Sequence, residues 1–561
     1  MKKTGLIIIT VLLSVTSLLI YSIQGTPLLT WISRIIDIII IFFLYYEIII
    51  GISSTQYPLQ YIIKNKALII FSIFYSVIIT ILTIRNFHGK SNSYFNIIIL
   101  AARSLFLLFR IIKTVNSLEE LLRKLNERPA RSIVASFLII ITTGTILLML
   151  PFSSTNGHSL NFIDAFFTAT SAVCVTGLIV VDTATAFSIT GKIIILLLIQ
   201  TGGLGIMILT YFSSFILGRR VSLEEKQRLM LVLSNSDLSD IVRNLKKIIY
   251  LTFSIEGIGA ILLFIEFSRK EQISLKVIFS SIFHSISAFC NAGFSLYSDS
   301  LEGFKSSPAV IFTISALIIL GGLSFSVIFN FAEFFKKEKK LSLNSKVVLI
   351  WTGILLGSGF ILFYATEHIN TLYKYNTPTQ YLSAFFQSVT LRTAGFNSVS
   401  FSGLRSATLV FMCFFMFIGA ASGSTAGGIK VNTIAVIFAY IKSMITNSPK
   451  TKLYQYQLSQ SDILKAYALL QYGILAVFAG TFALALTHSA PLKDIIFETV
   501  SAFGTVGVST GLTSQLNTFG KIIIIMLMYT GRLGPLTILS VFSSNKTDYG
   551  IEYPEGNILI G

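Results

Sequence analysis

Charged residues are scarce in this chain: Asp, Glu, Lys and Arg together make up only 12% of its 561 residues. A soluble domain usually needs about 25% to cover its surface. Hydrophobic residues account for 53% of the chain, and the mean hydropathy is +0.78. Because too little polar material is present to surround a water-soluble core, the composition predicts a membrane protein.

Cysteine and histidine are scarce as well, with three and five residues respectively. The three cysteines, Cys174, Cys290 and Cys413, provide no disulfide framework. We find no cluster of His, Cys or carboxylate residues at metal-ligand spacing. A nucleophile–base pair and a phosphate-binding loop in a βαβ context are also missing. The sequence therefore predicts neither an enzyme nor a tightly bound cofactor.

The positive charge, +18 in total, is concentrated in a few loops. They cover residues 123–131, 219–226, 243–247, 336–346 and 442–452. The positive-inside rule places these loops in the cytoplasm. They flank apolar spans and form no basic domain, so nucleic acid is not expected as a partner. Residues 6–23 lack a following signal-peptide cleavage site and are interpreted as a retained helix. We expect a multi-pass protein of the cytoplasmic membrane.

A short loop with a glycine occurs four times, each time after an apolar segment too short to cross a membrane. The four stretches are Cys174–Leu178, Cys290–Phe294, Arg392–Phe396 and Gly504–Val508. Ten residues before each glycine stands a phenylalanine: Phe167, Phe283, Phe385 and Phe497. Six residues before it stand Ser171, Ser287, Val389 and Ser501. Matched contexts of this kind indicate four structural repeats.

In each repeat a long apolar segment precedes the short helix, and a second long segment follows the glycine. A helix of about 11 residues is only about 16 Å long and cannot span. It must therefore enter and leave the membrane on one side, which the basic loops predict to be extracellular. We predict pore repeats at residues 132–220, 221–335, 336–450 and 451–561. The expected fold is an all-α polytopic membrane protein with four M1–pore-helix–M2 repeats in pseudo-four-fold arrangement around one pore per chain.

The glycine loops are predicted to form a selectivity filter for K⁺. Backbone carbonyls at membrane depth are tolerated only where they line a water- or ion-filled path. Glycine reaches the positive φ angles that aim successive carbonyls at one axis, and rings of carbonyls replace the hydration shell of K⁺. One such glycine is commonly a helix C-cap, but four in matched contexts favour a filter. The predicted filter residues are Cys174, Val175, Thr176, Gly177, Cys290, Asn291, Ala292, Gly293, Arg392, Thr393, Ala394, Gly395, Gly504, Thr505, Val506 and Gly507.

The second long segment of the third repeat is interrupted by ten small residues, Gly419–Gly428. Their poor helix propensity predicts an unwound loop inside the membrane, which we interpret as a gate below the filter. Arg532 stands within the corresponding segment of the fourth repeat, where the carbonyls of this loop are its expected partners. Lys430 either assists the gate or extends to the interface. The predicted gate residues are Gly419, Ser422, Gly423, Ser424, Thr425, Gly427, Gly428 and Arg532.

Three further acidic residues lie in apolar surroundings within the repeats. Glu256 is mid-span in the second repeat, where a structural hydrogen bond and a functional role are both open. Asp164 and Asp494 occupy equivalent positions at the starts of pore helices. There a carboxylate complements the helix dipole and adds negative potential at the pore mouth.

Residues 1–115 carry four apolar segments and are predicted to form a transmembrane four-helix bundle, joined to the repeats by an amphipathic linker at 116–131. The fourth segment contains Arg103, Arg110 and Lys113, which Asp37 and Glu47 could face. One interpretation is a voltage-sensor-like domain. The other is an accessory bundle, favoured by the irregular spacing of only three basic residues.

From about residue 131 to its end, the chain resembles the Trk/Ktr/HKT superfamily of potassium and sodium transporters. The likeness rests on the four glycine loops, on Gly419–Gly428, on Gly531–Pro535 and on the closing Tyr553–Gly561, which is similar to the end of KtrB-like membrane proteins. The N-terminal region and the cysteines at 174 and 290 depart from the family pattern. The resemblance implies K⁺ uptake by a homodimer with separate pores, controlled by a cytoplasmic RCK-type nucleotide-binding regulatory subunit on another chain.

Two alternatives remain open at this point. One is a sodium or Na⁺/K⁺ cotransporter of the same superfamily, although glycine in all four loops favours K⁺. The other is a secondary transporter with discontinuous helices, for which paired inverted repeats would be expected instead of four similar hairpins.

Overall fold

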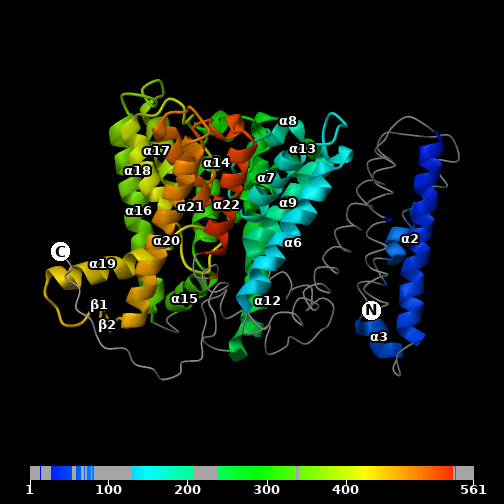
Figure 1. Ribbon diagram of the computed structural model, residues 1–561, viewed down its shortest axis with the longest axis horizontal. Coiled ribbons are helices and arrows are strands. Elements are labelled where there is room, and N and C mark those ends of the chain that lie inside the picture. The colour runs from blue at the N-terminus through cyan, green and yellow to red at the C-terminus, as the bar shows by residue number, and fades with distance from the viewer. Residues whose placement is uncertain are drawn as a thin grey trace.

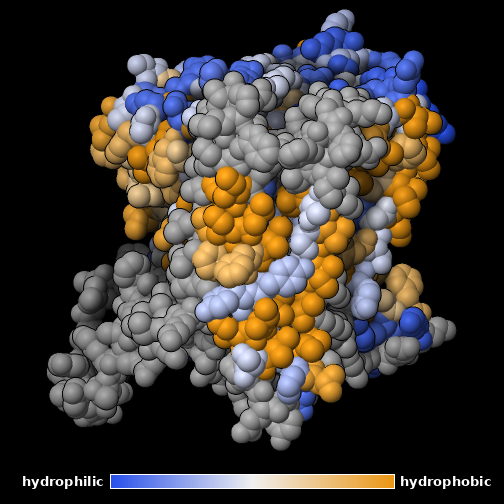
Figure 2. Space-filling view, turned by 90° about the vertical axis from the view of Figure 1, so that its right-hand side faces the viewer, coloured by the Kyte–Doolittle hydropathy of each residue, from blue (hydrophilic) through white to orange (hydrophobic). Residues whose placement is uncertain are grey.

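The computed structural model describes residues 27–53, 58–64, 129–205, 238–336 and 340–534, parts of 69–80, and residues 13 and 537. Over these ranges the chain is helical except for short 3-10 turns, loops and one small hairpin, β1 (Lys452–Leu453) with β2 (Tyr456–Gln457). Four of the described helices are long and apolar enough to cross a membrane, and a bent pair makes a fifth candidate. Figure 2 shows hydrophobic side chains over the middle of one face and hydrophilic ones along its upper rim.

The helices after residue 128 follow an order of long helix, short helix and second helix four times. The first set consists of α6 (Pro129–Met149), α7 (Phe162–Val173) and α9 (Ile189–Leu204), with the small α8 (Thr183–Ala186) between the last two, and the second set of α12 (Leu238–Lys270), α13 (Leu275–Phe289), α14 (Pro308–Gly322) and α15 (Phe325–Phe335). The third set consists of α16 (Leu343–Glu367), α17 (Thr377–Thr390), α18 (Ser406–Phe417) and α19 (Val431–Ile445). The fourth set consists of α20 (Gln460–Ala485), α21 (Leu492–Gly504) and α22 (Thr518–Leu533). Figure 1 shows these helices packed side by side, with α15, α19 and the hairpin at the lower end.

The short helices α7, α13, α17 and α21 are slightly longer than the predicted length of about 11 residues, and side-chain caps fix the starts of α13 and α17. The side chain of Ser274 accepts from the N–H of Val277 at 3.4 Å and caps α13. Asn376 accepts from the N–H of Thr379 at 3.3 Å, and Pro378 fits the first turn of α17. With 12 to 15 residues, all four remain shorter than a membrane span.

The second helix of the second set is broken, which corrects the prediction of one long segment after the glycine. The chain bends by 104° between α14 and α15. Leu323 is extended, with φ −79° and ψ 141°, and the side chain of Ser324 starts α15 by accepting from the N–H of Val327 at 3.4 Å. The hydropathy continues through this break, so the sequence pattern did not distinguish it from a straight span.

The other second helices also end or break at glycine. α18 and α19 are separated by the unwound segment Ile418–Lys430, as the small residues at 419–428 predicted. Gly205 directly follows α9 and Gly534 directly follows α22, and both glycines have a φ of +79°. A left-handed residue of this kind stops a helix at little cost only when it is glycine.

Three of the four recurring phenylalanines anchor the short helices in the core. Phe167, Phe283 and Phe497 are fully buried. In the third repeat Phe386 is buried instead, while Phe385 is only partly buried and lines a groove on the side of α17. The third repeat therefore packs its short helix differently from the others.

The N-terminal region is described in part, by α2 (Pro27–Ser53), α3 (Pro58–Lys64) and neighbouring residues, which Figure 1 shows to one side of the other helices. α2 corresponds to one of the four apolar segments predicted in residues 1–115. Asp37 is buried and accepts from Tyr75 Oη at 3.2 Å, next to a separate cluster formed by Ile40, Leu44, Tyr75 and Ile79. The predicted fourth span with Arg103, Arg110 and Lys113, and linker residues 116–128, lie outside the described residues.

Candidate functional site

The four glycine loops share an unusual backbone conformation. In each loop both the glycine and the residue two positions before it have a positive φ. The angles are 56° and 91° at Val175 and Gly177, 59° and 69° at Asn291 and Gly293, 64° and 80° at Thr393 and Gly395, and 50° and 92° at Thr505 and Gly507. Non-glycine residues rarely adopt positive φ, so its occurrence at four equivalent positions marks a common local structure.

The four loops lie against one another in the order in which they occur along the chain. A Cβ atom on each glycine would run into the carbonyl oxygen of the residue before the next glycine. These approaches are Gly177 to Ala292 at 2.5 Å, Gly293 to Ala394 at 2.8 Å, Gly395 to Val506 at 2.7 Å, and Gly507 to Thr176, which overlap. The fourth loop thus meets the first, and the loops form a closed ring.

Hydroxyl side chains fix the ring to the short helices. The hydroxyls of Ser171 and Ser501 accept from the N–H groups of Gly177 and Gly507, both at 3.1 Å. Ser287 Oγ donates to the carbonyl of Phe294 at 2.8 Å. In the third repeat, where Val389 replaces this serine, Thr390 Oγ1 donates to the carbonyl of Phe396 at 2.5 Å. The recurring serine is therefore a positioning residue for the loop, a role that its spacing alone did not reveal.

Three buried polar side chains hold the segment that follows the glycine in repeats two to four. Glu498 accepts from Ser509 Oγ at 2.5 Å, from the N–H of Thr510 at 3.0 Å and from Thr513 Oγ1 at 2.5 Å. His284 Nε2 accepts from the N–H of Leu296 at 3.4 Å. Nδ1 of the same ring therefore carries the proton and donates to the carbonyl of Ser280 at 2.7 Å.

The third of these side chains is Gln387. With its amide oriented to satisfy its neighbours, Oε1 accepts from the N–H groups of Ser398 and Val399 at 3.2 and 3.3 Å. Sequence reasoning missed all three residues. Glu498 and His284 stand nine positions before their glycines and Gln387 eight, so a buried polar residue near this offset was the available signal.

The unwound segment between α18 and α19 lies against the second and fourth repeats. Backbone hydrogen bonds join its two ends. The N–H of Gly419 donates to the carbonyl of Ile429 at 2.7 Å, and the N–H of Val431 donates to the carbonyl of Ala420 at 3.2 Å. The N–H and Oγ1 of Thr425 both donate to the carbonyl of Gly321, at 3.3 and 2.9 Å. The segment is thereby attached to the point where α14 ends.

Arg532 connects three repeats. Its guanidinium, on α22, donates to the carbonyl of Thr425 in the unwound segment and to that of Gly202 on α9. The first contact confirms the partner expected from the sequence. Lys430 Nζ also donates to this segment, to Ala426 at 2.5 Å and Gly427 at 3.3 Å, so it does not extend to the interface. Two cations are held by carbonyls of one short stretch.

The glycines of the second helices let them approach the ends of the short helices. A Cβ atom at any of three glycines would overlap a carbonyl at the end of the short helix in the same repeat. The pairs are Gly202 with Val173, Gly321 with Phe289 and Gly531 with Phe503. In the third repeat, Gly427 of the unwound segment approaches the fourth glycine loop instead, because a Cβ atom on Gly427 would overlap Thr505 Oγ1. The unwound segment therefore lies directly beside the glycine loop of the fourth repeat.

Two of the three further acidic residues, Glu256 and Asp164, have protein partners. Glu256 accepts from Gln200 Nε2 at 3.0 Å, which supports the structural interpretation of this residue. Asp164 lies in the first turn of α7, as predicted, and also pairs with Lys521 at 2.6 Å. Asp494 lies in the first turn of α21. Within the described part of the chain, no group of three or more His, Cys, Asp or Glu side chains is arranged to hold a metal ion.

Comparison with known proteins identifies the family to which this chain belongs. The model of the TrkH family, described as a cation transport protein, matches residues 116–548. The chain belongs to the TrkH family. It is 40% identical over 436 residues to Ktr system potassium uptake protein B of Bacillus subtilis, covering 77% of this chain and 97% of that protein. It is 38% identical over 442 residues to potassium/sodium uptake protein NtpJ of Enterococcus hirae, with the same shares.

A solved TrkH-family structure has the same fold. The potassium transporter TrkH from Vibrio parahaemolyticus superimposes with a TM-score of 0.58 at 21% sequence identity, covering 73% of this chain and 85% of that one. The family match and the Bacillus subtilis relative make this TrkH family protein a transporter and not an enzyme, and the shared fold is that of a helical, multi-pass membrane protein. The family match begins at residue 116, so the N-terminal residues before it stand outside the shared part.

Proposed function

We propose that this TrkH family protein takes up K⁺ across the cytoplasmic membrane through one pore per chain, formed by four M1–pore-helix–M2 repeats in pseudo-four-fold arrangement. The observation that carries the proposal is the closed ring of glycine loops with positive φ. Carbonyls from four loops around one axis are the ligands that replace the hydration shell of K⁺. The hydroxyls of Thr176, Thr393 and Thr505 in these loops are buried without a protein partner, which suits groups next to a path for hydrated ions.

The unwound segment Ile418–Lys430 is the proposed gate. It lies beside the fourth loop and is held by Arg532 and Lys430. A guanidinium below a cation filter repels cations electrostatically, and its hydrogen bonds to Thr425 and Gly202 keep the segment in place. Release of these bonds would move the segment and the positive charge together.

The regulatory partner is proposed from the family resemblance. A cytoplasmic RCK-type regulatory subunit on a separate chain would bind the nucleotide, and two copies of this chain would form a homodimer with separate pores. Figure 1 shows α19, which has Lys442 in its last turn, and the β1–β2 hairpin at the lower end of the molecule, whereas α13 and α17 lie near its upper end. This arrangement supports a docking place for the regulatory subunit at the lower end.

The N-terminal region is proposed to be an accessory four-helix bundle and not a voltage sensor. Neutralising Arg103 and Arg110 separates the two interpretations. We expect unchanged voltage dependence of the K⁺ current, whereas a shifted or shallower voltage dependence would establish a sensor.

Rubidium uptake in a bacterial host that lacks K⁺ transport tests the proposed function. We expect uptake of Rb⁺ that excess K⁺ inhibits much more strongly than excess Na⁺. Equal inhibition by Na⁺ would favour the Na⁺/K⁺ alternative that the name of the Enterococcus relative suggests. In proteoliposomes, membrane potential alone should drive the flux; an absolute need for a Na⁺ or H⁺ gradient would contradict a pore.

A further inference from the structure

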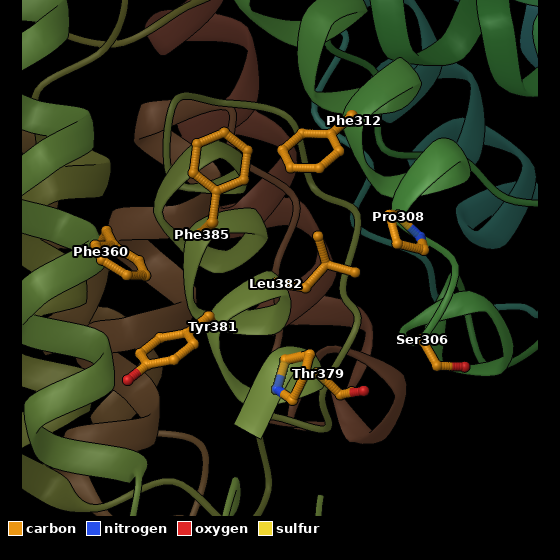
Figure 3. A pocket seen from close by; sticks show the side chains of 9 residues that line it. Ser306, Pro308, Phe312, Phe360, Thr379, Tyr381, Leu382 and Phe385 are labelled. Carbon is orange, nitrogen blue, oxygen red and sulfur yellow. The ribbon is translucent and has the colours of Figure 1, made fainter. Parts of the chain in front are cut away.

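A groove on the outer surface of the third repeat is lined mainly by apolar side chains. It lies where α14, α16 and α17 meet and encloses about 430 Å³. Figure 3 shows its lining, with the rings of Phe312 and Phe385 at one end and Ser306 and Thr379 at the other. Leu382 and Phe360 line the part between them. The groove is therefore apolar along most of its length and polar at one end.

The groove exists because the third repeat departs from the others. In repeats one, two and four the recurring phenylalanine is fully buried, whereas Phe385 turns toward the groove and packs against Phe312, with ring centroids 5.7 Å apart. Phe312 itself is 55% exposed. In a membrane these rings contact hydrocarbon chains and not water.

Two lysines stand at the polar end. Lys305 precedes Ser306 in the chain, and its Nζ lies 3.3 Å from Tyr375 Oη and 4.4 Å from the ring centroid. Lys374 Nζ lies 5.3 Å from the same ring centroid. Neither lysine forms an ion pair with a described residue within 4.0 Å. Two ammonium groups around one tyrosine provide a positive rim that an anion would complement.

One acidic residue, Glu302, offsets part of this positive charge, because it interacts electrostatically with both lysines. Glu302 and Asp299 lie in the same loop, and Glu302 accepts from Asn397 Nδ2 at 3.0 Å. Burial, and then the neighbouring charge of Asp299, raise the pKa of Glu302, although Lys305, Lys374 and the hydrogen bond from Asn397 lower it. The net effect is a carboxylate that is less readily ionised than a free one, so it only partly offsets the two ammonium groups.

We propose that this groove binds one anionic phospholipid, with an acyl chain along Leu382, Phe312 and Phe385 and the phosphate between Lys305 and Lys374. A single turn of α-helix, about 10 Å across and 5.4 Å long, occupies roughly 400 Å³, so a partner helix would fit for only one turn. A flexible acyl chain fills such a space, and each methylene that leaves water for it is favourable. The inference needs only the membrane location of the chain and is independent of the ion that it carries.

The bound lipid would support the third glycine loop. α17 forms one wall of the groove and leads directly into Arg392–Gly395. Gln387 and Thr390, on the same helix, hold the segment after the glycine. An acyl chain against Leu382 and Phe385 therefore fixes the helix that positions this loop.

Native mass spectrometry of the full chain tests the proposal, with phosphatidylglycerol and phosphatidylcholine as probes. We expect one tightly retained phosphatidylglycerol per chain. The double variant Lys305→Ala/Lys374→Ala should weaken its binding about thirtyfold, since each basic residue near a phosphate contributes about a fivefold effect. Phosphatidylcholine binding should change much less. Lys276→Ala/Lys493→Ala, which removes two exposed lysines at the starts of other pore helices, is the matched control.

A groove-filling variant, Leu382→Trp, provides the second test. It should displace the retained phospholipid while leaving the oligomeric state unchanged. Unaltered phosphatidylglycerol binding in both the lysine and the tryptophan variants would overturn the proposal. A change from dimer to monomer in Leu382→Trp, with lipid retention unaltered, would show that a second copy of the chain occupies the groove, and would also overturn it.

Discussion

The carbonyl oxygen of Thr176 occupies the space that a Cβ atom on Gly507 would need. These residues belong to the first and the last glycine loop of one polypeptide. Their contact completes a ring in which each glycine faces the carbonyl before the next one. The requirement for glycine is therefore double: a positive φ and the absence of a side chain.

Replacing a ring glycine should abolish discrimination between K⁺ and Na⁺. In Gly177→Ser and Gly507→Ser, the added Cβ would displace a carbonyl of the neighbouring loop, and the left-handed backbone would cost about 1–2 kcal/mol more than with glycine. We expect the K⁺/Na⁺ selectivity ratio to fall about tenfold or more in competition assays of Rb⁺ uptake. Gly353→Ser is the control, because a Cβ atom there meets nothing within 4 Å. Preserved selectivity in the ring variants would contradict the filter assignment.

Removing the guanidinium of Arg532 should increase ion flux. Arg532→Ala eliminates two charge-assisted hydrogen bonds, to Thr425 and Gly202, each contributing about 1.5–3 kcal/mol. A bias of this size shifts a closed–open equilibrium by roughly tenfold or more. Deletion of residues 422–427 should have the same direction of effect. Arg269→Ala, at an exposed arginine, should leave Rb⁺ uptake unchanged. Wild-type flux in both gate variants would show that this segment does not limit conduction.

Glu498 should stabilise the conformation of the segment that follows the fourth glycine loop. Glu498→Ala leaves the buried donor of Thr513 without its acceptor, at a cost of about 1–3 kcal/mol, and also removes the acceptor of the partly buried donors of Ser509 and Thr510. Glu498→Gln keeps one acceptor oxygen, and the hydroxyl of Thr513 can turn to accept. We therefore expect a lower melting temperature and lower K⁺ selectivity for the alanine variant than for the glutamine variant. Equal losses would indicate that the charge of Glu498 matters and its hydrogen bonds do not.

The ion pair of Asp164 and Lys521 should stabilise the contact between the first and fourth repeats. Both side chains are largely buried, with 18% of Asp164 and 16% of Lys521 exposed, and Asp164 Oδ1 lies 2.6 Å from Lys521 Nζ. A double-mutant cycle with Asp164→Asn and Lys521→Met should give a coupling free energy of about 1.5–3 kcal/mol in denaturant unfolding. The exposed pair Asp462–Lys465, at 3.9 Å, should give only about 0.2–0.5 kcal/mol. Similar values for the two pairs would refute a structural role for the buried one.

The sequence predicted those features that recur or that differ sharply in composition. Four matched glycines identified the short helices, and ten small residues in an apolar segment identified the break between α18 and α19. Arg532 was assigned its partner because a guanidinium in the membrane needs acceptors, and the unwound carbonyls were the available ones.

Features that depend on long-range packing were not predictable in this way. The bend between α14 and α15 follows Gly321–Leu323, and the similar Gly202–Leu204 of the first repeat forms the end of α9. The carbonyls of Gly321 and Gly322 accept from the unwound segment of the third repeat, a contact that the local sequence does not reveal. Glu498, His284 and Gln387 all hold the segment after a glycine, but they are three different residue types, so no repeated residue identified them in the sequence. Phe385 occupies the same sequence position as the buried phenylalanines of the other repeats, and its different packing is visible only in the folded chain.

The closure of the ring within one polypeptide has a genetic consequence. A filter built from four separate subunits is damaged by a single defective copy, so a mixture of normal and mutant subunits loses most of its activity. Here all four loops are translated together, and the contact of Gly507 with Thr176 needs no second chain. An allele that damages one glycine should therefore be recessive, and cells that express both forms should keep transport in proportion to the normal gene dose.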